Sequence, residues 1–242
     1  MKKLVVAYAI VTILGVCVSA PFAQTSGSIA NSQNLILHYD NPPTVGFRLT
    51  SIARLTTFYP FVLDQDLWEF KIARPAAPVV DFKPSNTTWS TITVNTTQAT
   101  TVTVTWKNVM RPAITTLVSY DVTVTASMSA ADDVEFTLQI VNNHTPSAST
   151  YAIHSVIFPI VRVDLSPSAI HVPQHQALVL PRYAGFVVND PVTNAWTHTQ
   201  NAHPWSMQFA ALYDERTAPG SATTLNPSRL FYFASKDTQR HH

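Results

Sequence analysis

Residues 101–106 read Thr-Val-Thr-Val-Thr-Trp, and residues 120–125 read Tyr-Asp-Val-Thr-Val-Thr. Residues 134–141 read Val-Glu-Phe-Thr-Leu-Gln-Ile-Val. In each segment apolar and polar side chains alternate with a period of two residues. This period places one face of a β-strand on a core and the other face in water, which is the pattern of antiparallel sheets. We therefore expect these segments to be strands of an antiparallel fold.

Further strand-like segments, separated by turn-forming residues, lie on both sides of these three. They are Leu35–Tyr39, Val45–Phe58, Leu67–Ile72, Ser90–Val94, Tyr151–Asp164, Leu178–Leu180, Gly185–Val188, Trp205–Tyr213 and Leu230–Ser235, and residues 120–125 belong to a longer stretch, Leu117–Met128. No segment has the caps and spacing of an amphipathic helix. There is also no internal repeat of roughly 20–50 residues, which disfavours a propeller or a solenoid. The sequence predicts an all-β antiparallel β-sandwich of two large sheets.

The composition agrees with this fold class and excludes one class of function. The chain has 242 residues, of which 46% are hydrophobic and 12% are charged, and its formal net charge is +1. Threonine, serine, asparagine and proline supply most of the polarity, and threonine suits a pleated surface. A chain so close to neutrality is not a nucleic-acid-binding protein that relies on a broad basic footprint. The length is compatible with a single all-β domain.

The first residues have the features of an export signal. Lys2 and Lys3 form a positively charged start, residues 4–18 are almost all apolar, and a small-residue stretch ends at Ala23. We expect a signal peptide over residues 1–23, cleaved before Gln24, and hence a secreted or periplasmic bacterial protein. The apolar run is too short to be a membrane span.

The single cysteine and the residues after the signal complete the expected domain organisation. Cys17 follows Val16, which is bulkier than the residue usual before a lipoprotein cysteine, so lipid anchoring through Cys17 is disfavoured. Cleavage before Gln24 would leave no cysteine for a disulfide. The polar residues 24–34 predict a flexible lead-in. Residues 35–242 are then the β-sandwich domain.

No catalytic motif is recognisable, and the chain has neither a Gly-x-Ser-x-Gly elbow nor a His-Glu-x-x-His pair. Four histidines could share a metal, but Pro173 denies the first two a common helical face, so we interpret them as loop residues. These histidines are His171, His175, His198 and His203. Three acidic residues, Asp64, Asp66 and Glu69, could bind a cation or act as an acid pair, but a turn before the next strand is the favoured interpretation. We predict no catalytic residue, no metal and no cofactor.

The tryptophans are the candidate ligand contacts. Trp68 and Trp106 lie in strand-like segments and are expected in the core. Trp196 and Trp205 flank loops, where an indole face could stack on a sugar ring. These two residues are the candidate carbohydrate-binding residues.

Residues 134–237 contain five segments whose order and spacing resemble a known family. The segments are Phe136–Asn143, Ile157–Ile160, Leu178–Gly185 followed by Asp190-Pro191, His203–Asp214 and Leu230–Asp237. They resemble the N-terminal β-sandwich that precedes the (β/α)8 barrel in a group of bacterial glycoside hydrolase-like proteins. That sandwich belongs to the galactose mutarotase-like supersandwich class, so the resemblance implies a supersandwich fold and sugar chemistry for the parent architecture.

In that family the barrel carries the catalytic carboxylates, and glycoside hydrolysis needs two of them. A barrel takes about 250 residues, whereas the sequence ends shortly after Asp237, so no catalytic position is carried over. We expect a truncated or split N-terminal module that is non-catalytic alone and packs on the missing catalytic barrel. A free-standing carbohydrate-binding or cell-surface interaction domain is the alternative. An epimerase-type enzyme that uses the concave face of the sandwich is a third possibility.

Overall fold

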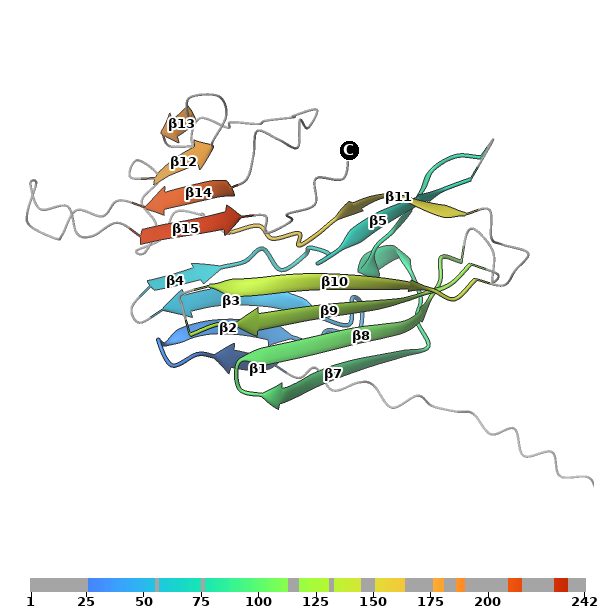
Figure 1. The fold of residues 1–242 in the computed structure, drawn as a ribbon, viewed down its shortest axis with the longest axis horizontal. Helices are drawn as coiled ribbons and strands as arrows, with labels where there is room; N and C mark the ends of the chain where they lie inside the picture. The colour runs from blue at the N-terminus through green and yellow to red at the C-terminus, as the bar shows by residue number, and fades with distance from the viewer. Residues whose placement is uncertain are drawn as a thin grey trace, which may run out of the picture.

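The computed structural model describes residues 26–54, 57–74, 77–112, 118–130, 133–144 and 151–163, together with the strands 176–180, 186–189, 209–214 and 229–234. The described residues contain antiparallel strands and no α-helix, and their only helical turn is the 3-10 turn Pro84–Asn86 (Figure 1). The prediction of an all-β antiparallel fold is confirmed.

The described strands form four sheets rather than the two large sheets that we expected. The first has the order β1-β2-β3-β4, made of Ser26–Ala30, Leu35–Asp40, Arg48–Arg54 and Thr57–Pro60. The second has the order β10-β9-β8-β7, made of Val134–Asn142, Tyr120–Met128, Thr101–Val109 and Thr91–Gln98. The third has the order β11-β5-β6, made of Ala152–Ile157, Glu69–Ala73 and Val80–Phe82. The fourth has the order β13-β12-β14-β15, made of Phe186–Asn189, Gln176–Leu180, Phe209–Asp214 and Arg229–Ala234.

The second sheet is built from the strictly alternating segments. Along β8 and β9 the burial of the side chains alternates from residue to residue, as the period of two requires. Val104 of β8 lies opposite Val124 of β9, and both are at most 2% exposed. The apolar row of each strand therefore faces the core, and the threonine row faces outward.

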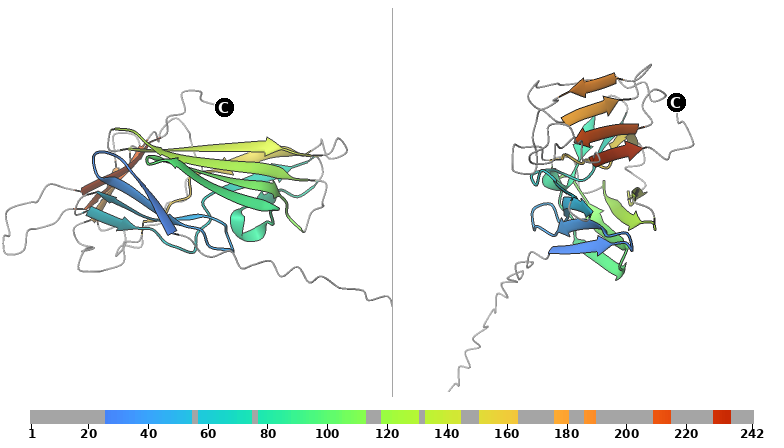
Figure 2. Two further views of the ribbon diagram at one scale, coloured as in Figure 1. Left: turned by 90° about the horizontal axis from the view of Figure 1, so that it is seen from below. Right: turned by 90° about the vertical axis from the view of Figure 1, so that its left-hand side faces the viewer.

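The first and second sheets pack face to face, as Figure 2 shows in the view along the strands. Ile29, Leu37 and Leu49 of the first sheet share one buried cluster with the apolar rows of β8 and β9. Asn31 ties the two layers together at one end, because its side-chain amide donates to the Ser129 carbonyl at 3.0 Å. This two-layer core is the part of the fold that a sandwich requires.

Short connections, rather than a continuous ladder, join the first sheet to the third. The Val62 amide donates to the Arg162 carbonyl at 2.9 Å, and the Ile160 amide donates to the Leu67 carbonyl at 2.9 Å. An isolated bridge pairs Phe61 with Val163. Because these contacts are single bonds between irregular segments, the layer is split into two sheets instead of forming one large sheet.

The N-terminal boundary of the fold also differs from the expectation. We expected a flexible lead-in over residues 24–34, but Ser26–Ala30 forms β1 and pairs with β2 from Ser26–Asp40 to Ala30–Ile36. The reason is Ile29, whose side chain is only 1% exposed and belongs to the core cluster. A single apolar residue in a polar segment was enough to anchor an edge strand.

Candidate functional site

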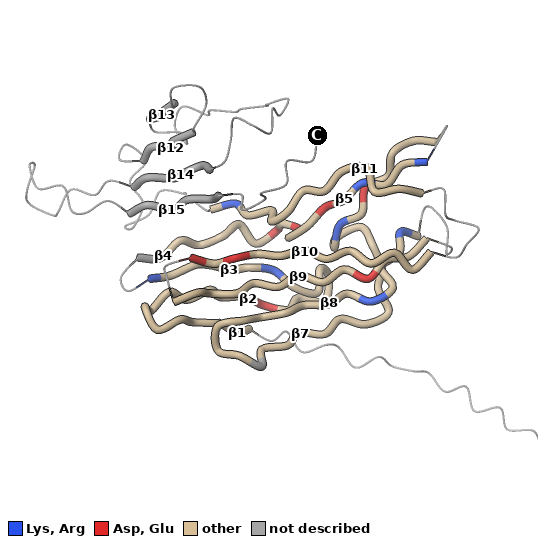
Figure 3. Tube along the Cα trace, viewed as in Figure 1, with Lys and Arg blue, Asp and Glu red and all other residues tan. Residues whose placement is uncertain are grey.

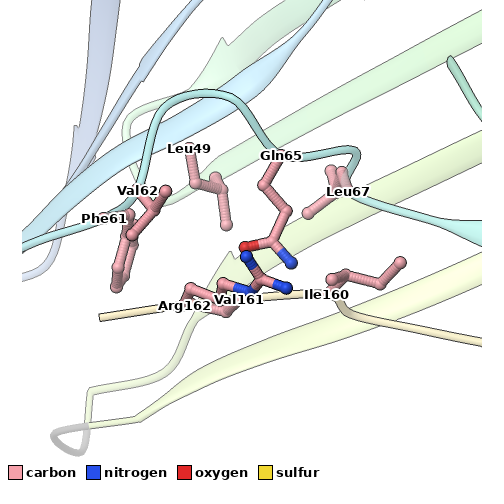
Figure 4. Close-up of a pocket in the computed structure, with 8 residues that line it drawn as sticks. All are labelled: Leu49, Phe61, Val62, Gln65, Leu67, Ile160, Val161 and Arg162. Atoms are coloured by element: carbon pink, nitrogen blue, oxygen red, sulfur yellow. The ribbon is translucent and has the colours of Figure 1, made fainter. Parts of the chain in front are cut away.

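A small hollow lies where residues 61–67 and 160–162 meet β3 (Figure 4). It is lined by Leu49, Phe61, Val62, Gln65, Leu67, Ile160, Val161 and Arg162. Its cavity volume is about 10 Å³, which is room for one water molecule and not for a sugar ring. The Gln65 Oε1 atom is buried without a hydrogen-bond partner among the described residues, so an ordered water fits here better than a substrate.

Two of the three acidic residues considered as cation ligands, Asp66 and Glu69, are held in structural roles, and the third, Asp64, lies in a turn. Asp66 accepts two hydrogen bonds from Ser85, one from its amide and one from its hydroxyl, both at 2.7 Å. Glu69 lies 3.5 Å from the ammonium of Lys71 in an ion pair. Within the described ranges, no three histidine, cysteine or acidic side chains are grouped so that they could hold a metal.

A further acidic residue, Asp81, is also held by neighbouring side chains. The Arg111 guanidinium hydrogen-bonds to the Asp81 carboxylate, and the side-chain amide of Asn86 donates to it at 2.9 Å. The hydrogen bond from Arg111 lowers the pKa of the Asp81 carboxyl, although partial burial opposes this. A carboxylate with a lowered pKa stays ionised and is not suited to be a general acid at neutral pH.

The two tryptophans that the structure describes lie where the sequence predicted. Trp68 and Trp106 are both 0% exposed and pack edge to face with ring centroids 5.7 Å apart. Their predicted place in the core is confirmed. The candidate carbohydrate-binding residues Trp196 and Trp205 lie outside the described residues, as do the four histidines considered as metal ligands.

A partly buried histidine that the sequence did not single out, His144, follows the end of β10. The His144 ring packs edge to face on Tyr120, with centroids 4.6 Å apart, and its Nδ1 lies 3.2 Å from the Ser119 carbonyl. Burial lowers the pKa of His144 and raises the pKa of Tyr120 to about 12. Both groups are therefore neutral at pH 7, and the pair is a packing contact rather than an acid–base pair.

The edge strand β11 exposes large apolar side chains. Ile153 lies opposite Ile72 of β5, and Val156 lies opposite Phe70. Opposed residues share a face of the sheet, so Ile153 and Val156 point to the side on which Ile72 and Phe70 are fully buried. Nevertheless Ile153 is 43% exposed and Val156 is 47% exposed. The core-facing side of the third sheet is therefore covered at β5 and partly uncovered at β11.

On its other face the same strand exposes one more large apolar side chain, Ile157, which is 49% exposed. Exposed apolar residues that gather on one element mark an interaction site more often than isolated ones do. The signal in the sequence was the run Ala-Ile-His-Ser-Val-Ile, which has apolar residues without alternation. We call residues 152–157 the β11 surface.

The outer face of the second sheet carries few charged side chains and is rich in hydroxyl groups. In β8 and β9, Thr103 pairs with Thr125 and Thr105 pairs with Thr123, with hydroxyl oxygens 3.2 Å apart in each pair. Figure 3 shows few charged residues along these strands. Lys107 and Asp121 near one end neutralise each other in an ion pair of 2.6 Å. We call this outer face of β7 to β10 the threonine face.

No protein-family model matches the chain, and no curated protein matches it. Among the described residues, the structure has no helix that is long and apolar enough to cross a membrane. A function must therefore be inferred from the fold, the β11 surface and the threonine face.

Proposed function

We propose that this chain is a β-sandwich module of an exported glycoside hydrolase-like protein, built as a galactose mutarotase-like supersandwich. The module is non-catalytic by itself and packs against a sugar-processing (β/α)8-barrel domain. Two features support this proposal. One is the resemblance of residues 134–237 to the sandwich that precedes such barrels, and the other is the two-layer antiparallel core.

The observation that carries the proposal is the β11 surface. Ile153 and Val156 lie on the core side of the third sheet and are close to half exposed. Leaving such side chains in water costs about 25 cal/mol for each Å² of apolar area that a neighbour could cover. A domain interface recovers that free energy, because the centre of an interface is apolar and depleted of charge. In β11 the only side chain that can become charged is His154.

Sequencing the genomic DNA on both sides of the reading frame tests the proposed architecture. The proposal expects a (β/α)8-barrel coding sequence next to this one, in the same frame or the same transcription unit. Unrelated neighbours on both sides would contradict it.

The expected export is tested separately. Lys2, Lys3 and the apolar run predict that the mature protein begins at Gln24. N-terminal sequencing of protein recovered from outside the cytoplasm should therefore start at Gln24. A mature chain that starts at an acylated Cys17 would instead establish a lipoprotein.

The threonine face favours a second candidate function, a free-standing carbohydrate-binding domain. Its neutral hydroxyl groups can donate to and accept from sugar hydroxyls without a charged group. Pull-down with insoluble cellulose and chitin tests this function. Binding that is weakened by Thr103→Val and Thr125→Val together, but not by Ile153→Asp, would favour this function over the module.

A further inference from the structure

Edge strands are the places where a β-protein can pair with another chain, and most edges in this molecule carry a protecting feature. The ladder of β7 is irregular between Asn95 and Gln98, and that of β11 is irregular between Ile153 and Ser155. The strands β1, β4, β6 and β13 have 5, 4, 3 and 4 residues and offer little length for pairing. The remaining outer strand of the fourth sheet, β15, begins with the charged Arg229.

The edge strand β10 lacks these features. It has 9 residues, and its ladder with β9 runs from Val134–Met128 to Asn142–Tyr120 without a register shift. It contains no proline and no lysine, and its only charged residue is Glu135. Among the described residues, β10 pairs with β9 on one side only. A long, regular and nearly neutral free edge of this kind is a template for another strand.

The side chains of β10 show which strand fits. Phe136, Leu138 and Ile140 face inward and pack against the core, yet they are only partly buried. Thr137 and Gln139 face outward and are exposed. At the centre of the strand, an added strand must therefore bring apolar residues opposite Phe136, Leu138 and Ile140 and uncharged polar residues opposite Thr137 and Gln139.

We propose that the chain forms a two-fold symmetric dimer in which β10 pairs antiparallel with β10 of a second copy, centred on Leu138. In this register Phe136 lies opposite Ile140 of the second copy, and Leu138 lies opposite its own counterpart. The inward apolar row then continues across the dimer axis, and the two second sheets become one continuous sheet.

The central residues of β10 are complementary to themselves in this register, which supports a second copy as the occupant. Thr137 lies opposite Gln139 of the second copy, so the outward row pairs a hydroxyl with an amide. Glu135 lies opposite Val141 of the second copy, which keeps the two Glu135 carboxylates at opposite ends of the paired strands and avoids like-charge contact. Two-fold interfaces require this self-complementarity, because the same patch must serve on both subunits. This dimer does not depend on the proposed function, because β10 and the β11 surface belong to different sheets.

Light scattering coupled to size-exclusion chromatography across a concentration series tests the dimer with the full chain. The double variant Thr137→Lys with Gln139→Lys places lysine opposite lysine twice across the axis. The matched control, Thr137→Lys with Gln139→Glu, places lysine opposite glutamate twice. Within one chain both positions lie directly opposite uncharged threonines on β9, Thr125 and Thr123, so we expect either variant to fold, which thermal melting verifies.

The wild-type chain and the lysine–glutamate variant should both be dimers. The dimer dissociation constant of the double-lysine variant should rise by roughly tenfold or more. A wild-type monomer at every concentration overturns the proposal. A double-lysine variant as dimeric as the wild type, or a lysine–glutamate variant as monomeric as the double-lysine variant, overturns it as well.

Discussion

Arg48 holds Asp40 with two parallel hydrogen bonds across the β2–β3 ladder. The Arg48 Nε donates to Oδ1 at 2.7 Å, and Nη2 donates to Oδ2 at 2.8 Å. The third nitrogen, Nη1, donates to the Leu63 carbonyl at 3.0 Å, so the same side chain also holds the connection after β4. The Asp40 side chain is only 8% exposed and the Arg48 side chain is 23% exposed, so the pair is largely shielded from water.

Arg48→Ala should lower the free energy of unfolding by about 3 kcal/mol, because it leaves the buried Asp40 carboxylate without its main donor. Urea denaturation measures the change. Arg48→Lys is the matched control, since it retains the charge but not the two-pronged geometry, and it should cost less than the alanine variant. An alanine variant as stable as the wild type would show that the pair contributes nothing net.

Gly46 occupies a position that a side chain cannot enter. Its φ is +74°, and a Cβ there would lie 2.4 Å from Ile92 Cδ1 and 2.9 Å from Trp106 Nε1. We expect Gly46→Ala to destabilise the fold by roughly 2 kcal/mol or more through backbone strain and this clash. Ile92→Val removes the Cδ1 methyl group, so Gly46→Ala should cost less in the Ile92→Val background. Equal costs in the two backgrounds, measured by thermal unfolding, would show that the clash is not the cause.

His144 should make stability depend on pH in a defined direction. Burial against Tyr120 lowers the pKa of His144 in the folded state, so the folded protein binds fewer protons than the unfolded chain. Stability should therefore fall as the pH drops below the ordinary histidine pKa of about 6.5, and the loss should level off below the lowered pKa. The groups that face the ring are Tyr120 and Tyr151, and Arg74 packs over the Tyr151 ring.

Denaturation at a series of pH values measures this dependence. His144→Gln should remove its part of the slope. A slope that persists in the His144→Gln variant would contradict the assignment.

The purified chain should not hydrolyse aryl glycosides or polysaccharides above background. The described carboxylates Asp66 and Asp81 are occupied by Ser85 and by Arg111 with Asn86, and the water-sized hollow does not admit a sugar. Turnover that disappears when a single aspartate or glutamate is replaced would overturn the non-catalytic proposal.

The alternating segments were sufficient to predict much of the fold. The period of two in β8, β9 and β10 reflects a physical division between core and water, and that division can be read residue by residue. The strand β1 could not be predicted in this way, because four of its five residues are serine, glycine or alanine. Its place depends on Ile29 reaching a core that distant strands build.

The candidate surfaces were less accessible to sequence reasoning. The exposure of Ile153 and Val156 depends on where the facing sheet ends, which no local pattern encodes. The register irregularity between Ile153 and Ser155 also decides which β11 side chains share a face with Phe70. Trp68 was correctly placed in the core because it adjoins an alternating strand, whereas the burial of His144 arises from contacts between three separate segments.

The most direct test of the proposed module is a calorimetric titration of the purified chain with the (β/α)8-barrel domain encoded beside it. We predict saturable binding that Ile153→Asp with Val156→Asp abolishes and that Thr91→Asp with Thr93→Asp, two exposed positions on β7 outside the β11 surface, preserves. Equal loss of binding with the β7 variant would contradict the β11 surface as the interface, provided that the melting temperatures show both variants to be folded. If no such barrel is encoded, or if the barrel does not bind the wild-type chain, the account is contradicted.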